Sequence, residues 1–308
     1  MSESTIRNRS FKDALFSGSM DAEGMEDVLQ LYRDLFPVVS VGAGEGADTR
    51  ELGEEEIQMR LDEGFTLLEP VDILPDTGEL AKRAEEVVKI LVGHSEDAET
   101  VTLTMSSLLE DPDAFHGLAA VWLKEGDAVL REKLGDLEGV NPEAVMFVLF
   151  NSLKGSFLEA AARFSHFDTG KWEQGRCPVC GGEPAAAYTM GEGGKRHLIC
   201  HRCETHWRFR RLTCPYCGHE SPEESGYLFS EDPEYRFLTG AVCGECRSYI
   251  KSWRVEGDDP GDLHPEVEDL KTPGFDRAVE GESYRRGAPN IFGVRVGTAE
   301  DKGRPERV

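Results

Sequence analysis

The sequence predicts an α+β protein in which an N-terminal helical bundle precedes two small tandem modules of the zinc-ribbon type. Its 308 residues are about twice the length of a typical domain. The apolar pattern is helical before residue 170 and then changes to short strands and turns. All eight cysteines lie in the second part, as four Cys-x-x-Cys pairs. We therefore expect a helical domain at residues 1–170, metal modules at 171–212 and 213–256, and a C-terminal extension at 257–308.

Two segments of the first part carry strong helical signals. Thr77 can cap a helix whose apolar face repeats every three to four residues and ends near Gly93. A longer helix is expected after Asn141, which serves as the N-cap, with Pro142 at the first helical position. Its apolar residues continue to Phe164, so this helix should be well buried.

Glycines divide the rest of the first part. A looser helical pattern runs from Phe115 to Leu130, and Gly117 and Gly126 are expected to break it. The run Gly42–Gly46 has neither the dinucleotide-binding spacing nor the Lys-Ser/Thr of a phosphate loop. We interpret it as a flexible loop.

Charge and apolar content restrict the classes of function. The chain has 34 basic and 59 acidic residues and a net charge of −25, which repels nucleic acid and anionic membranes. Residues 171–256 are neutral, with 12 residues of each sign, so a boundary is expected near residue 170. The longest apolar run, Val145–Phe150, is too short to span a membrane. No secretory signal is readable in Met1–Asp13, and we expect a cytoplasmic protein.

The cysteine-rich part repeats itself. Cys177–Gly181 reads CPVCG, and Cys214–Gly218 reads CPYCG, 37 residues later. Each is followed by a hairpin-like stretch of 19 or 25 residues and a second pair. Beyond that pair, Thr205–Arg208 aligns with Ser248–Lys251 in the order polar, aromatic, apolar, basic. These are two copies of one small module.

The repeated pairs predict metal sites. A module of this size cannot bury enough apolar surface to fold alone, so a cross-link is needed. In a reducing cytosol, two-residue spacing favours a metal knuckle over a disulfide. The repeat favours sequential grouping, although interleaved grouping stays open. The expected ligands of two mononuclear tetrathiolate ions, either iron or zinc, are Cys177, Cys180, Cys200 and Cys203, and Cys214, Cys217, Cys243 and Cys246.

A basic cluster lies beside these cysteines, interrupted only by Glu204. It has three interpretations: a nucleic-acid patch with Trp207 or Phe209 stacking on a base, charge balance for a tetrathiolate site of net charge −2, or a docking face for a partner. The net charge elsewhere disfavours nucleic acid. We find no catalytic constellation and expect no enzyme. The candidate partner-binding residues are Arg196, Arg202, Trp207, Arg208, Arg210 and Arg211.

The cysteine motifs in their flanking sequences resemble the formate dehydrogenase accessory protein family, FdhE. The resemblance covers residues 170–295 and rests on Trp172–Gly181, Cys200–Trp207, Cys214–Cys217, Cys243–Lys251 and Ser283–Gly293. It implies a helical domain followed by two rubredoxin-like modules, with iron reported as the metal and the eight cysteines as its ligands. It also implies a cytoplasmic maturation factor that binds the catalytic subunit of a molybdenum- or tungsten-dependent formate dehydrogenase.

This chain departs from the family in its acidity and in its longer Glu- and Gly-rich region, Gly42–Gly64. Other classes of function remain open. They are rubredoxin-like electron transfer, a nucleic-acid-binding zinc ribbon and a thiol-based redox sensor.

Overall fold

The chain divides into two compact units. The computed structural model describes residues 26–40, 42, 52–165, 167, 169, 171–256, 265–290 and 292–294. Unit one consists of residues 1–52 and 68–165, and unit two consists of residues 53–67 and 166–308. The three segments expected after residue 170 therefore fall into one unit, which also takes in residues 53–67 from the N-terminal part.

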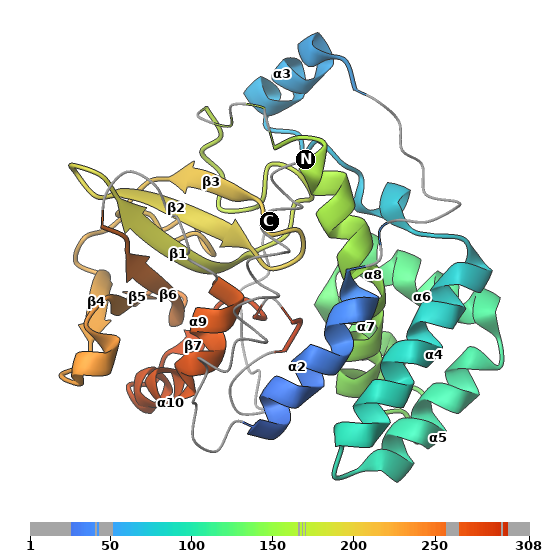
Figure 1. Ribbon diagram of the computed structural model, residues 1–308. Coiled ribbons are helices and arrows are strands. Elements are labelled where there is room, and N and C mark those ends of the chain that lie inside the picture. Colours follow the sequence, from blue (N-terminus) through green and yellow to red (C-terminus); the bar gives the residue numbers. More distant parts are fainter. Residues whose placement is uncertain are drawn as a thin grey trace. The chain divides into compact units, whose positions relative to one another are not determined.

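Unit one is a bundle of helices (Figure 1). Helix α8 forms its core, because it packs on α2, α4, α5 and α7 and is buried along most of its length. The elements are α2 (Glu26–Val39), the 3₁₀ turn η1 (Pro70–Ile73), α4 (Thr77–His94), α5 (Ala98–Leu109), α6 (Pro112–Glu125), α7 (Asp127–Gly135) and α8 (Pro142–Ala162).

Helix termini in unit one follow local side-chain chemistry. The Asn141 side chain accepts hydrogen bonds from the N–H groups of Glu143 (3.0 Å) and Ala144 (3.3 Å), which confirms the expected cap of α8. Thr77 is not the cap of α4. The Asp76 carboxylate takes that role by accepting from the Glu79 N–H at 3.0 Å. Because a carboxylate also interacts favourably with the positive helix end, Asp76 is the better cap.

The segment expected to be broken at two glycines is broken at one. Gly126 separates α6 from α7 with φ +88°, a conformation that glycine adopts at low cost. Gly117 has negative φ and lies inside α6, so it does not interrupt the helix. Of the loop expected at Gly42–Gly46, only Gly42 is within the described residues.

By length and composition, α8 is the one helix of the described chain that could cross a membrane. The sequence predicted no membrane-spanning segment here, because the uninterrupted apolar run in this helix, Val145–Phe150, is short. In the structure, 83% of the apolar window of α8 is buried. Such burial is typical of the core helix of a bundle.

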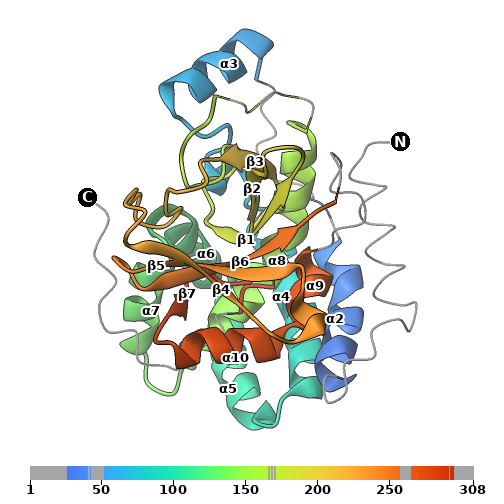
Figure 2. The same ribbon diagram turned by 90° about the vertical axis from the view of Figure 1, so that its left-hand side faces the viewer.

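Unit two is built on one mixed sheet of seven strands. The strands are β1 (Pro184–Met190), β2 (Lys195–Cys200), β3 (His206–Phe209), β4 (Ser225–Phe229), β5 (Leu238–Cys243), β6 (Ser248–Arg254) and β7 (Arg285–Arg286). Their order is β3-β2-β1-β6-β5-β4, and β7 pairs with β6 (Figures 1 and 2). A 3₁₀ turn, η2 (Pro233–Tyr235), and helices α3 (Glu54–Glu63), α9 (Pro265–Lys271) and α10 (Pro273–Gly281) complete the unit.

The two modules are tandem in sequence but continuous in structure. Each contributes three antiparallel strands, β1-β2-β3 and β4-β5-β6. The first strand of one module pairs in parallel with the third strand of the other, from Ala186 beside Lys251 to Thr189 beside Arg254. This pairing joins the two tandem modules into one sheet.

The C-terminal segment covers one face of the shared sheet. Phe275 and Val279 of α10 belong to the same core cluster as Val242, Tyr249 and Trp253 of β5 and β6. The apolar area that they bury stabilises the second module. Residues 265–290 are therefore a structural part of unit two.

Candidate metal centre

The structure gathers the eight cysteines into two groups of four. The groups are those expected from sequential pairing, and the four sulfur atoms of each lie within 4.8 Å of one another. The first group is Cys177, Cys180, Cys200 and Cys203, and the second is Cys214, Cys217, Cys243 and Cys246. Interleaved grouping is excluded by this arrangement.

The first knuckle of each group has the same backbone hydrogen bonds. The Cys177 N–H donates to the Gly182 carbonyl at 2.8 Å, and the Gly181 N–H donates to the Cys177 carbonyl at 3.0 Å. At Cys214 and Gly218 the equivalent distances are again 2.8 and 3.0 Å. The turn requires φ of +71° at Gly181 and +77° at Gly218, which explains the glycine after each knuckle.

The second knuckle of each group ends in a left-handed residue that is not glycine. Glu204 has φ +56° and Arg247 has φ +54°, and each directly follows the last cysteine of its group. This conformation costs about 1–2 kcal/mol for a residue with a side chain. Arg247 is held by a hydrogen bond to the Ser283 carbonyl (3.2 Å) and by stacking on the Tyr284 ring (4.2 Å). The C-terminal segment thus helps to fix the second site.

The spacing of the sulfurs fits a tetrahedral metal ion. Four sulfurs about 2.3 Å from one ion lie roughly 3.8 Å apart. A disulfide instead requires about 2.05 Å, and all eight cysteines are unbonded. The observed Sγ–Sγ distances are 3.5 Å for Cys177–Cys203 and Cys180–Cys200, 3.4 Å for Cys180–Cys203, 3.7 Å for Cys214–Cys246 and 3.8 Å for Cys217–Cys243.

Electrostatics also require a cation at these sites if all the sulfurs are to be ionised. Burial and the neighbouring thiols raise the pKa of Cys177 well above its usual value. Four thiolates therefore coexist only around a positive ion, which a divalent metal supplies. Three members of the second group are buried, whereas Cys217 is exposed.

The N-terminal segment 64–67 supports the first knuckle, a contact that the sequence analysis missed. The Leu67 N–H donates to the Pro178 carbonyl at 2.9 Å, between the two cysteines of the knuckle. The Gln174 side chain donates to the Gly64 carbonyl at 2.9 Å. The Gln174 carbonyl in turn accepts from the indole N–H of Trp207 at 3.1 Å. No sequence motif marks this segment, because most of these bonds involve backbone groups.

The knuckle of the second module is enclosed at two glycines. A Cβ atom at Gly175 would overlap the backbone carbonyl of Pro215, and one at Gly287 would overlap the ring of Tyr216. The Tyr216 hydroxyl donates to the Pro184 carbonyl of β1 at 2.9 Å. The loop Cys214–Gly218, called here the second metal loop, therefore packs closely against the first module and the C-terminal segment.

The structure separates the members of the basic cluster. Trp207 is 1% exposed, and Arg196 and Arg202 are also buried, so these three side chains are not displayed at a surface. Arg196 donates to the Thr213 carbonyl at 3.1 Å, next to the second metal loop. For Arg196, this placement favours the interpretation that the side chain balances the negative charge of a tetrathiolate site. Arg208, Arg210 and Arg211 are exposed, and Arg210 pairs with Glu220 at 2.6 Å.

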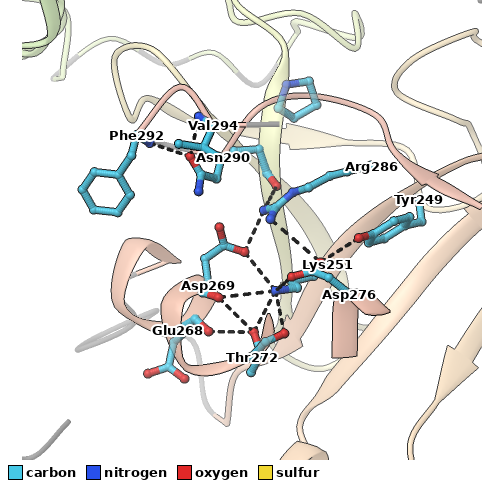
Figure 3. A network of polar contacts seen from close by, with 12 residues as sticks. Tyr249, Lys251, Glu268, Asp269, Thr272, Asp276, Arg286, Asn290, Phe292 and Val294 are labelled. Atoms are coloured by element: carbon cyan, nitrogen blue, oxygen red, sulfur yellow. Dashed lines mark hydrogen bonds and ion pairs between the residues drawn. The ribbon is translucent and has the colours of Figure 1, made fainter. Parts of the chain in front are cut away.

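A buried network of charges joins β6, α9, α10 and β7 (Figure 3). The Lys251 ammonium lies 3.0 Å from the Asp269 carboxylate and 2.5 Å from that of Asp276. Arg286 pairs with Asp269 at 2.7 Å, and the Tyr249 hydroxyl donates to Asp276 at 2.7 Å. Two cations thus face two anions inside the unit.

The Lys251 ammonium has hydrogen-bond acceptors beyond the two carboxylates. Lys251 is fully buried and also donates to the carbonyl (3.0 Å) and hydroxyl (2.9 Å) of Thr272. Burial alone would raise the pKa of Asp269, but the cations of Arg286 and Lys251 lower it below the usual value. This network was not predicted from the sequence. The available signal was a lysine in the middle of strand β6, between Ile250 and Ser252.

Fold and site together define the class of protein. It has a helical unit and a second unit in which one mixed sheet carries two four-cysteine sites that could each hold a metal ion. A family model described as "FdhE, central domain" matches residues 176–211. The chain is 23% identical over 198 residues to the Protein FdhE homolog of Aquifex aeolicus, covering 58% of this chain and 69% of that protein. It is 32% identical over 124 residues to the homolog of Pseudomonas putida, covering 38% of each chain.

A solved structure of an FdhE protein has a similar fold. The structure resembles the crystal structure of the FdhE protein from Pseudomonas aeruginosa with a TM-score of 0.58 at 19% identity, covering 93% of this chain and 94% of that one. At this identity the likeness shows a shared fold. Together these matches confirm the resemblance to the FdhE family that the cysteine motifs indicate.

Proposed function

We propose that this chain is a cytoplasmic accessory protein that binds the catalytic subunit of a molybdenum- or tungsten-dependent formate dehydrogenase and supports its activation. It performs no catalysis itself. The eight cysteines hold two mononuclear ions, iron or zinc, and the ions stabilise unit two as a binding platform for the immature enzyme.

The observation that supports this proposal is the pair of four-cysteine centres on a shared sheet, in a chain similar to FdhE proteins along most of its length. Each centre closes its coordination with four sulfurs. It therefore leaves no position for the metal-bound water that hydrolytic catalysis uses. A structural role in a binding platform needs no such position.

The test uses the native host. Affinity purification of the tagged chain from cells that make formate dehydrogenase should recover its catalytic subunit at a defined stoichiometry. Deletion of the gene should lower formate dehydrogenase activity while the subunit polypeptide persists. Normal activity in the deletion strain, together with no recovered subunit, would contradict the proposal.

Electron transfer is a second candidate, and the exposure of Cys217 favours it. An iron bound there would have one sulfur in contact with solvent, through which electrons could enter from a partner. The iron would have to cycle between Fe(III) and Fe(II). Anaerobic purification from the native host followed by metal analysis decides this point, because zinc in both sites excludes redox cycling.

A further inference from the structure

Strand β4 forms an open edge of the sheet. It is the last strand in the order and pairs only with β5 among the described residues. An edge strand presents unpaired backbone groups to any extended chain of suitable shape. At the other edge, β3 carries the exposed Arg208 between the buried Trp207 and Phe209, and such a charge discourages strand addition. The β4 sequence SGYLF contains neither a charge nor a proline.

Two exposed aromatic side chains lie on one face of β4. Tyr227 is 40% exposed and Phe229 is 73% exposed, and their ring centroids are 6.4 Å apart. They alternate along the strand and therefore share a face. Tyr227 also lines a surface pocket with the exposed Leu212, and Ala241 of β5 forms another part of its wall. An apolar surface of this kind beside an open edge is typical of an interaction site.

The charge around β4 restricts what can bind there. Residues 212–235 contain six acidic residues and no Lys or Arg, whereas residues 171–256 as a whole are neutral. Glu223 and Glu224 precede the strand, and Glu231 and Asp232 follow it, all four exposed. Pairing of β4 with the β4 of a second copy would bring these carboxylates together, so charge opposes self-association.

We propose that the outer edge of β4 binds an extended segment of a partner polypeptide in which apolar residues lie between Lys or Arg residues. This inference rests on the proposed function, which makes the partner the formate dehydrogenase subunit. Backbone hydrogen bonds add the segment as a strand, and its apolar side chains pack on Tyr227 and Phe229. Its basic residues meet the acidic residues at the two ends of β4.

The experiment compares matched variants of the full-length chain for affinity toward the purified catalytic subunit. The apolar variant is Tyr227→Ala/Phe229→Ala, and its control is Leu103→Ala, which removes a 64% exposed side chain from α5. The charge variant is Glu231→Lys/Asp232→Lys. Its control is Glu54→Lys/Glu55→Lys, which changes the net charge equally at exposed positions of α3. Metal content and circular dichroism verify folding.

We expect each β4 variant to bind about tenfold more weakly than the wild type. The controls should match the wild type, and added salt should weaken the wild type more than the charge variant. Equal affinity of all variants overturns the docking site while leaving the proposed function intact. Failure of the wild type itself to bind the subunit overturns the proposed function instead. If the charge variant only aggregates, the acidic residues protect the edge against self-association and the docking site is rejected.

Discussion

Ala187 of β1 lies in parallel register beside Ser252 of β6, and this pairing joins the two metal modules. Each module alone has only about 40 residues, too few to bury a stable core without a metal or a neighbouring module. Joined, they share a sheet whose central strands are the first of one module and the last of the other. Loss of either metal should therefore destabilise the strands of both modules, because β1 and β6 are paired.

Replacement of one ligand tests this coupling. Cys177→Ser should halve the metal content, because metal binding and folding of the first module are one process. Backbone amides of β6 should also exchange faster, since β1 no longer holds its parallel partner. Hydrogen exchange followed by mass spectrometry measures both regions, and α8 in unit one is the internal control. Unchanged protection in β6 would contradict the coupling.

Close backbone packing at the second knuckle gives another prediction. Gly287→Ala places a methyl group into the Tyr216 ring and should destabilise unit two by about 1–3 kcal/mol. Gly117→Ala is the matched control, because it lies inside α6 with nothing within 4 Å of the added atom. The control should stabilise unit one by about 0.5–1 kcal/mol. Urea unfolding measures both variants, and equal effects would refute the packing argument.

Local chemistry was readable from the sequence, whereas long-range pairing was not. The two-residue spacing of the cysteines predicts the four metal knuckles, and Asn141 with Pro142 predicts the start of α8. These signals lie within a few residues of each other. Whether β1 pairs with β6 depends on side-chain packing over the whole sheet, which no local pattern encodes. The contact of Leu67 with Pro178 is likewise invisible, because backbone groups form it.

The acid limit of unit two should depend on Asp269. Its pKa in the folded state lies below the usual value of 3.8. A lowered carboxyl pKa contributes stability that is present above the unfolded value and is lost as the pH falls through the folded value. Wild-type stability should therefore decrease below about pH 4. In Asp269→Asn this part of the dependence should be absent, although loss of metal in acid continues in both proteins.

The comparison is made by urea unfolding between pH 7 and pH 3, followed by the fluorescence of the unit-two tryptophans 172, 207 and 253. Trp122→Phe removes the signal from unit one in both proteins. Parallel curves for wild type and Asp269→Asn over the whole range would show that Asp269 does not set the acid limit.

Removal of the buried lysine gives the sharpest test of the charge network. Lys251→Met leaves the carboxylates of Asp269 and Asp276 facing only Arg286, a net charge of −1 inside the unit. Breaking one side of a buried ion pair costs about 3–5 kcal/mol. The double variant Lys251→Met/Asp276→Leu restores neutrality and should recover part of this loss, although the Tyr249 hydroxyl then loses its acceptor.

Urea unfolding with metal bound measures the single and double variants, and Tyr249→Phe in the double background removes the unpaired hydroxyl. A double variant less stable than Lys251→Met would show that specific hydrogen bonds, rather than charge neutrality, hold α10 on the sheet. Recovery in the double variant would instead show that the C-terminal segment is held mainly because its carboxylates neutralise a lysine that the strand has buried.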